Sequence, residues 1–413
     1  MKRVEGTVEG VRRANLSRVL RLVHEDGPLS RAALTDATGL NRSTIGALVG
    51  DLSAAGLVQE GAPDLQRRVG RPSPNVSAAA GIVAVAINPE VDAVTVAAVA
   101  LDRTVLVRER IEVPELTTTH RVASMAAECI ERWRRDVLAG CRIVAAGIAV
   151  PGLVRAEDGL VRRAPHLDWT DAPLRDQVAE ATGLPTAIDN DATLGALAES
   201  LYGAGRGVRD LVYVNGGASG IGGGLVIDGH LVRGAGGYAG ELGQNRPGIA
   251  NPADRRSPER GTVEDEVSRA RLLAVLGLMS ADEPTLEAAI RASSSVEAVA
   301  EVDRQRRILA TALANAVNVL NPSVVVLGGF LATLLEQDPE GLLAAVGEQA
   351  MRTNAEQLQL RPAALGPDRL LVGAAEIAFE TLLTDPLGVD QPDASGRADP
   401  LSAAEAVPSN RAP

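Results

Sequence analysis

The sequence predicts an α/β protein preceded by a small helical domain. From residue 82 onward, apolar strand-like runs alternate with stretches of helical periodicity, which is typical of mixed sheets joined by crossover helices. Before residue 60, two short helical stretches flank Gly39, and the second opens with small polar residues. We therefore expect a head at residues 1–75, an α/β body at 76–385 and a disordered tail at 386–413, which is rich in Pro, Ala, Asp and Ser.

The composition of the 413 residues favours a cytoplasmic protein of two or three domains. Apolar residues make up 46% and aromatic residues only 2%, so Ala, Val, Leu and Ile must build the interior. Cys129 and Cys141 suit a reducing compartment and cannot supply a thiolate-rich metal site. No apolar run reaches the length of a membrane span, and no signal-peptide core opens the chain.

Charge differs between the head and the rest of the chain. Residues 1–75 hold eleven Arg or Lys against eight Asp or Glu, a net charge of +3. The remaining residues hold 30 basic and 45 acidic side chains, a net charge of −15. A mildly basic head suits a domain that binds nucleic acid, because phosphate attraction supplies non-specific affinity.

The head has the helix-turn-helix pattern. Residues 11–25 have helical spacing, and the chain then breaks at "DGPLS". Ser30 can cap a helix over "RAALTDATG", Gly39 marks a tight turn, and Asn41 can cap a helix that ends near Gly56. A second helix that opens in small polar residues after such a turn is typical of DNA-binding heads.

Three residues at the start of the second helix are candidate DNA contacts. In this motif the N-terminal residues of the second helix enter the major groove. Arg42, Ser43 and Thr44 therefore become candidate readers of bases and phosphates. The alternative is a helical hairpin that binds no DNA, with Arg42 a solvated charge.

A predicted wing follows this helix. The segment from residue 56 begins as a strand, turns through a Gly/Pro loop and returns with Arg67, Arg68 and Arg71. Arg71 in "RRVGRP" could lie in a minor groove or along phosphates. A flexible basic linker is the alternative, and both descriptions are compatible. We expect a winged helix-turn-helix that binds double-stranded DNA.

The body has alternating elements. Strands are predicted at residues 82–87, 93–101, 103–113, 143–152, 185–189, 210–215 and 222–229, and helices at 121–139, 174–183, 192–203 and 305–320. Folds of this kind bind ligands at the carboxyl ends of their strands.

Four segments of the body resemble the ROK family of repressors, open reading frames and sugar kinases. They are "GIAVPGLVRAEDGLVRRAPHLDW", "IDNDATLGALAE", "LVYVNGGASGIGGGLVIDGHLVRGAGGYAGELG" and "LANAVNVLNPSVVVLGGFL". The resemblance covers roughly residues 11–385 and includes the order of head and body. It implies an actin-like, sugar-kinase-like body of the ribonuclease H-like type, with two lobes and a ligand cleft between them.

The resemblance also implies ligand-binding residues. In the family's kinases the aspartate of an "ND" pair is the general base, which here is Asp191, with Asn190 beside it as a sugar-hydroxyl partner. Glu241 and Glu264 match two further sugar-contacting acids, and His166 lies in a sugar-facing segment. The residues also allow plainer roles. Asn190 and Asp191 can cap the next helix, the glutamates can be surface residues, and His166 can be structural.

The chain departs from the kinases at their phosphate loop. The family's kinases carry D-x-G-G-T after the first strand, where glycine N–H groups reach phosphate and aspartate helps to hold magnesium. Here Asn88, Pro89 and Glu90 stand at that position. Proline lacks a donor and glutamate repels phosphate. We expect no kinase activity and hence no catalytic residue. In the kinase alternative, Asp191 would be the base.

A second departure concerns zinc. The family commonly has a histidine after the "AGE" glutamate and a cysteine cluster before the next glutamate. Gln244 replaces the histidine, and Arg255, Ser257 and Thr262 stand where the cysteines would be. These side chains cannot form a thiolate zinc site. We therefore expect no cofactor and no metal, while Gln244 can still hydrogen bond to a ligand.

These features together predict a regulator of transcription. We expect a repressor, working as a homodimer or tetramer without a membrane, that binds a roughly palindromic operator. A carbohydrate or derivative in the body's cleft would shift it between DNA-competent and incompetent states. Two alternatives are a sugar kinase and a DNA-binding protein whose body has only a structural role.

Overall fold

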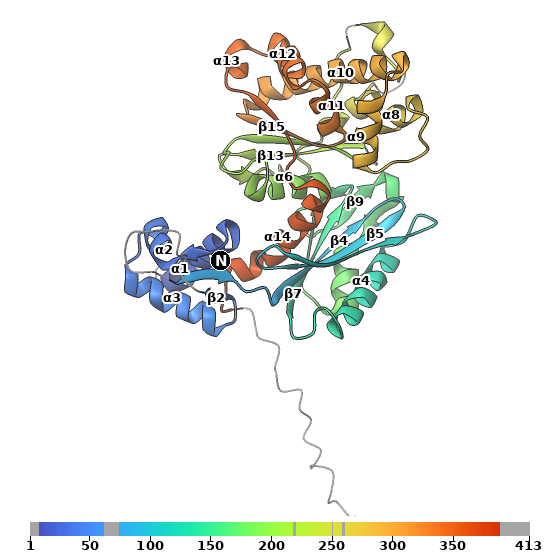
Figure 1. Ribbon diagram of the computed structural model, residues 1–413. Helices are drawn as coiled ribbons and strands as arrows, with labels where there is room; N and C mark the ends of the chain where they lie inside the picture. The colour runs from blue at the N-terminus through green and yellow to red at the C-terminus, as the bar shows by residue number, and fades with distance from the viewer. Residues whose placement is uncertain (1–7, 62–73, 218–219, 250, 258–260, 389–413) are drawn as a thin grey trace, which may run out of the picture.

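The computed structural model describes residues 8–61, 74–217, 220–249, 251–257 and 261–388. Figure 1 shows a small head beside the lower of two larger lobes. The predicted wing arginines Arg67, Arg68 and Arg71 lie outside the described residues, as does most of the predicted tail. None of the helices in the described ranges is both long and apolar enough to cross a bilayer.

The head begins as the sequence predicts. Its elements are α1 (Val8–Asp26), β1 (Leu29–Ser30), α2 (Arg31–Thr38), α3 (Arg42–Ala54), β2 (Val58–Gly61) and β3 (Asn75–Ala78). The Ser30 side chain accepts from the N–H of Ala33, and Asn41 accepts from the N–H of Thr44, so both predicted caps are confirmed. Between the two helices, Gly39 adopts the left-handed conformation that closes α2.

Three strands complete the head. They are ordered β1-β3-β2, and both pairings are antiparallel. The return strand β3 runs to Ala78, three residues beyond the predicted limit of the head. The body's first strand begins only four residues later, at Ile82. This short connection holds the head close to the first lobe.

The first lobe is built on a mixed five-stranded sheet of order β11-β7-β4-β5-β6. Its elements are β4 (Ile82–Pro89), β5 (Ala93–Ala100), β6 (Val105–Glu112), α4 (Thr119–Arg134), β7 (Arg142–Val150), β8 (Leu153–Val154), β9 (Val161–Ala164), η1 (Pro165–Leu167), β10 (Trp169–Ala172), α5 (Leu174–Thr182), β11 (Thr186–Asn190) and α6 (Asp191–Tyr202). Strands β4, β7 and β11 are parallel. Their carboxyl ends therefore meet at one edge, facing the second lobe.

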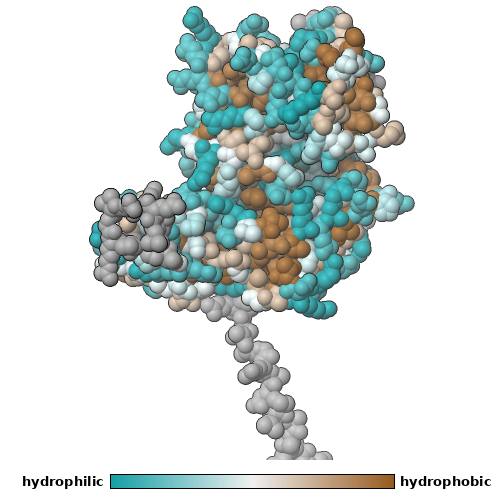
Figure 2. Space-filling view, in the orientation of Figure 1, coloured by the Kyte–Doolittle hydropathy of each residue, from teal (hydrophilic) through white to brown (hydrophobic). Residues whose placement is uncertain are grey.

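The second lobe repeats this plan with sheet order β14-β13-β12-β15-β16. Its elements are β12 (Leu211–Gly217), β13 (Gly220–Ile227), β14 (His230–Leu231), η2 (Leu242–Gln244), η3 (Pro252–Asp254), α7 (Val263–Glu266), α8 (Arg269–Val275), α9 (Glu283–Ala292), α10 (Val296–Leu320), β15 (Val324–Gly329), α11 (Phe330–Gln337), α12 (Pro339–Gln349), α13 (Arg352–Ala355), β16 (Gln359–Pro362) and η4 (Gly366–Asp368). The surface view shows the two lobes one above the other, with hydrophobic side chains gathered on the near face of the lower lobe (Figure 2).

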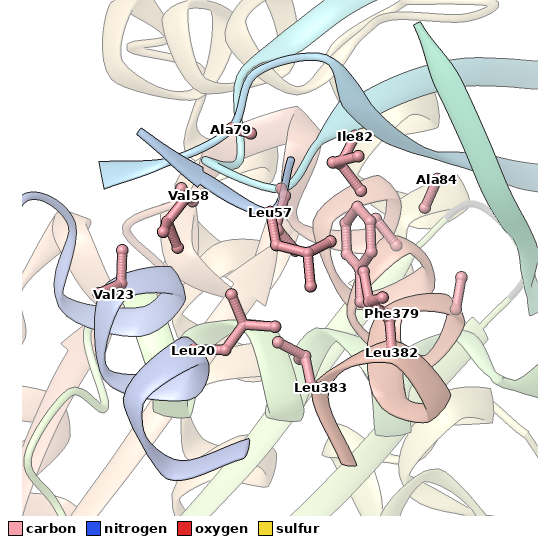
Figure 3. Close-up of a cluster of buried hydrophobic side chains, with 14 of the residues drawn as sticks. Leu20, Val23, Leu57, Val58, Ala79, Ile82, Ala84, Phe379, Leu382 and Leu383 are labelled. Atoms are coloured by element: carbon pink, nitrogen blue, oxygen red, sulfur yellow. The ribbon is translucent and has the colours of Figure 1, made fainter. Parts of the chain in front are cut away.

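The last helix, α14 (Arg369–Thr384), returns from the second lobe to the first. It packs on β4, β7 and α6, and its far end reaches α1 of the head. Phe379, Leu382 and Leu383 of α14 meet Leu20 and Leu57 of the head in one hydrophobic cluster (Figure 3). The head and the first lobe thus share a core.

A buried ion-pair network orders the loops of the second lobe. Arg304 of α10 is 1% exposed and binds Glu301 through two nitrogen atoms, at 2.8 and 2.7 Å. It also binds the Glu266 carboxylate at 3.0 Å. Glu266 in turn accepts the backbone N–H groups of Arg256 and Ser257. The carboxylate of Glu266 therefore holds the segment in which the resemblance would place zinc ligands.

We predict that Arg304→Met lowers the free energy of unfolding by about 3–5 kcal/mol, because two buried carboxylates lose their partner. Chemical denaturation followed by circular dichroism would measure the loss. Arg291→Met is the matched control, since Arg291 pairs with Glu287 and Glu336 at the surface and should cost less than about 1 kcal/mol. Equal stability losses in the two variants would contradict the assignment.

Candidate functional site

The first candidate site is the exposed start of α3. Arg42 and Ser43 are exposed and Thr44 is half-buried, while the other side of the helix is buried through Ile45 and Leu48. Asn41 accepts from the Ser43 hydroxyl at 2.7 Å and from the Thr44 N–H at 2.8 Å. Within the described residues, the Arg42 guanidinium forms no ion pair. It is therefore free to meet an anion in front of the helix.

The second candidate site lies at the carboxyl ends of the parallel strands of the first lobe. β11 ends at Asn190, and α6 starts at Asp191. The Asn190 amide accepts from the Thr193 N–H at 3.0 Å and donates to the Gly152 carbonyl, also at 3.0 Å. Asn190 thus caps α6 and ties it to the turn after β7. The capping role considered from the sequence is present, and both ends of this amide are already engaged.

Asp191 is half-buried, and its carboxyl group has the electrostatic properties of a functional acid. Burial is the main cause that raises the pKa of Asp191 to about 6; the charge of Glu241 adds to it, while the N–H of Ala192 and the charge of Arg369 act against it. Its side chain accepts from the Ala192 N–H at 2.8 Å. A carboxyl group with a pKa near 6 can gain or lose a proton close to neutral pH.

Two more of the predicted acids come from the second lobe, and one of them, Glu241, acts on Asp191 through its charge. Glu241 precedes η2, and its pKa is raised by burial and then by the charge of Glu264. Gln244 donates to the Glu264 carboxylate at 2.6 Å. The structure therefore brings together Asp191, Glu241, Glu264 and Gln244, although they come from different elements. Such a set offers several hydrogen-bond acceptors to hydroxyl groups and repels anions.

His166 lies apart from this acidic group in its contacts. It is exposed on η1, and its ring makes no hydrogen bond within the described residues. The preceding strand does approach the site, because a Cβ on Gly152 would meet the Arg163 carbonyl oxygen at 2.6 Å. His166 therefore follows a strand that packs against the turn to which Asn190 is bonded, and among the described residues no hydrogen bond fixes its ring there.

Arg369 is a buried residue near Asp191 that the sequence reasoning missed. It is 5% exposed at the start of α14, and it donates to Asn215 at 3.2 Å and to Glu283 at 2.8 Å. Its charge also acts on Asp191. Arg369 therefore joins the first helical turn of α14 to the second lobe. The helical spacing of apolar residues after Arg369 would have revealed the helix, but not its place beside Asp191.

Glu90, which directly follows β4, has an arginine partner on β6. Asn88 is buried and donates to the Glu90 carboxylate at 3.1 Å. Burial raises the pKa of Glu90, while Arg110 of the neighbouring hairpin strand lowers it. Arg110 lies 3.4 Å from Glu90 and 2.9 Å from Asp92. The arginine is thus already paired with carboxylates, so it offers a phosphate little net positive charge.

A separate cavity of about 360 Å³ lies among α8, α9 and α10 of the second lobe, where apolar side chains such as Leu272 and Ile290 and charged ones such as Arg306 line it together. None of the predicted ligand residues lines it. We place the candidate ligand site at the acids instead, because residues of both lobes meet there and the pKa values of Asp191 and Glu241 are raised. Within the described residues, no three His, Cys, Asp or Glu side chains group closely enough to hold a metal ion.

Curated relatives include both regulators and kinases. The xylose repressor of Caldicellulosiruptor bescii is 30% identical over 262 residues, which cover 59% of this chain and 64% of that protein. The xylose repressor of Bacillus subtilis is 25% identical over 383 residues, 90% of this chain and 97% of that protein. A glucokinase of Halalkalibacterium halodurans is 29% identical over 56% of this chain and 74% of that protein.

Solved structures have the same fold. A ROK family transcriptional regulator, a homologue of the E. coli MLC protein, aligns with a TM-score of 0.72 and 26% identity over 91% of this chain and 98% of its own. The ROK hexokinase of Thermus thermophilus aligns with a TM-score of 0.55 and 29% identity, over 73% of this chain and 99% of its own. Residues 84–381, well over half of the sequence, match the ROK family itself, and this protein belongs to that family.

Proposed function

We propose that this protein is a cytoplasmic transcriptional regulator, a repressor, whose body senses a sugar and catalyses no reaction. The observation that carries the proposal is that the same chain has an exposed start of α3 in its head and a group of acids from both lobes in its body. The alignments support it. The regulator covers 91% of the chain, whereas the whole hexokinase aligns within 73%. The xylose repressor of Bacillus subtilis likewise spans 90% of the chain.

The head is the proposed DNA-binding part. Arg42 has no ion-pair partner among the described residues, and it stands at the N-terminal end of α3, where the helix dipole favours phosphate. Ser43 and Thr44 follow on the same turn. Arg67, Arg68 and Arg71 would add wing contacts. Two heads in a homodimer or tetramer would read the two halves of an operator.

We predict that Arg42→Ala weakens binding to operator DNA by about 5- to 150-fold, because a base or phosphate contact is lost. The operator is first identified by genome-wide DNA pull-down with the purified protein. Fluorescence anisotropy then measures the dissociation constant. Arg352→Ala is the control, since Arg352 is 95% exposed on the second lobe. An unchanged affinity in Arg42→Ala, or no enriched DNA at all, would count against the proposal.

The cleft is the proposed effector site. Asp191, Glu241 and Glu264 accept hydrogen bonds, as sugar hydroxyls require, and Gln244 can donate or accept. Asn190 orients the start of α6, and His166 borders the site. The carboxylates, together with Glu90, favour an uncharged sugar over a phosphorylated one. Relatives include xylose repressors and glucokinases, so D-xylose and D-glucose are the first probes.

We predict that sugar affinity falls by up to about tenfold for each pH unit below 6, because a hydroxyl donates best to ionised Asp191. Isothermal titration of D-xylose and D-glucose from pH 5 to 8 would measure this. Asp191→Asn should weaken binding and remove the pH dependence.

The pKa of Asp191 is higher in the folded protein, at about 6, than its ordinary value of 3.8. As the pH rises from the lower value to the higher one, ionisation of Asp191 therefore lowers the free energy of unfolding. Asp191→Asn should therefore raise the unfolding free energy at pH 7.5 by about 1–2 kcal/mol.

Kinase activity is the alternative, with Asp191 as general base. Against it, Asn88, Pro89 and Glu90 occupy the end of β4, where a phosphate loop needs N–H donors and a metal ligand. Magnesium and ATP with D-xylose or D-glucose should give no more ADP than the same mixture with Asp191→Asn. A coupled ADP assay measures this. Sugar-dependent turnover that is lost in Asp191→Asn would establish the kinase instead.

We also propose that the fold needs no structural zinc. Glu266 already orders the segment at residues 256–257 through backbone hydrogen bonds, and Thr262 caps α7 by accepting from the Asp265 N–H. Arg255 bonds to the Ile249 carbonyl. We infer that these hydrogen bonds hold the loop in place, as a structural metal would otherwise do.

A further inference from the structure

The cleft ends of α6 and α14 lie together. Asp191 is the first residue of α6, and Arg369 is the first residue of α14. The charge of Arg369 acts on Asp191, and the same guanidinium binds Asn215 and Glu283 of the second lobe. A ligand that contacts Asp191, or a movement of the second lobe, therefore acts on the first turn of both helices.

The two helices pack without room between them. A Cβ on Gly373 of α14 would lie 2.2 Å from the carbonyl oxygen of Leu194 in α6. Only glycine permits this close approach. The helices have 12 and 16 residues, or about 18 and 24 Å. Because packed helices resist deformation, displacement at one end is carried to the other.

The last residue of α6 and a residue in the middle of α14 meet the head at His24. Tyr202, the last residue of α6, donates to Glu376 of α14 at 2.7 Å. Both side chains lie against Nε2 of His24, Glu376 at 2.8 Å and Tyr202 at 3.0 Å. His24 belongs to α1 of the head and is 1% exposed. Its Nδ1 donates to the Leu101 carbonyl at 2.5 Å.

Further contacts fix the position of α1 at this junction. Arg103 lies 4.6 Å from the centre of the Tyr202 ring and donates to the His24 carbonyl at 2.8 Å. Arg21 of α1 donates to Glu380 and Thr384 of α14. Turning the head would break the buried hydrogen bonds of His24. The same α1 packs on α3, to which Arg12 adds an ion pair with Asp51.

We propose that α6 and α14 form one coupling unit between the cleft and the head, and that the junction of His24, Tyr202 and Glu376 is its head-side contact. When a ligand occupies the cleft, the starts of the two helices change position. The junction then transmits this change to α1, and α3 moves with α1. The proposal rests on the proposed function for its biological meaning. The coupling itself can be measured without DNA or sugar.

The test is a double-mutant cycle read by hydrogen exchange on the full-length protein. Asp191→Asn perturbs the cleft end, and Tyr202→Phe removes one hydroxyl from the junction while keeping its ring. The readout is amide exchange in α1 residues 16–26, taken relative to α10 of the second lobe so that global stability cancels. We expect Asp191→Asn to change α1 exchange by about threefold or more in the otherwise unchanged chain, and by much less beside Tyr202→Phe.

Tyr238→Phe is the matched control, because Tyr238 is a partly exposed tyrosine of the second lobe; it should leave the effect of Asp191→Asn intact. If Tyr202→Phe fails to fold, Glu376→Gln replaces it in the cycle. An equal effect of Asp191→Asn with and without the junction would overturn the coupling. The exchange experiment uses no DNA, so its result is independent of the proposed function. If the unchanged protein binds no DNA, the proposed function fails, whereas the coupling can still be measured.

Discussion

The hydrophobic core shared by the head and the first lobe is the constraint on which the rest of the structure depends. Leu20 and Leu57 of the head, Ile82 of β4 and Phe379 of α14 are all buried in one cluster (Figure 3). Burial of each such side chain stabilises the fold by about 1.5–3 kcal/mol. The head therefore cannot turn freely on a linker. Its orientation is set by a helix that also supports the sheet carrying the cleft.

The helices of the head could be predicted from the sequence because local residues determine their ends. Ser30 and Asn41 cap helices through their own side chains, and Gly39 needs no partner to turn the chain. The five strands of the first lobe's main sheet were equally readable, since buried strands such as β4 form continuous apolar runs, whereas the short strands β8, β9 and β10 were not predicted. Helix α14 was missed, although its apolar residues have helical spacing; its role depends on tertiary contacts that no local pattern contains.

The candidate cleft could be predicted only through the family resemblance. Judged by local pattern, Glu241 and Glu264 are ordinary glutamates, and nothing in their own segments places them beside Asp191. Arg369 lies 178 positions from Asp191, so its influence on that acid appears only when the lobes are in place. The sequence predicted that Glu90 repels phosphate. Its pairing with Arg110 could not be predicted, because Arg110 comes from another strand. The chemistry is readable in the sequence where it is local, and hidden where two lobes supply it.

The position of α14 has a consequence for the order in which the protein can be completed during synthesis. The head and β4 emerge early, yet the helix that fills their common core is made some 290 residues after β4, roughly 15–60 s later at ribosomal speeds of about 5–20 residues per second. Until then, side chains such as Leu57 and Ile82 remain uncovered in the nascent chain. The head can therefore pack against α14 only when nearly the whole body has been synthesised. In a chain that terminates before α14, the head lacks this packing partner.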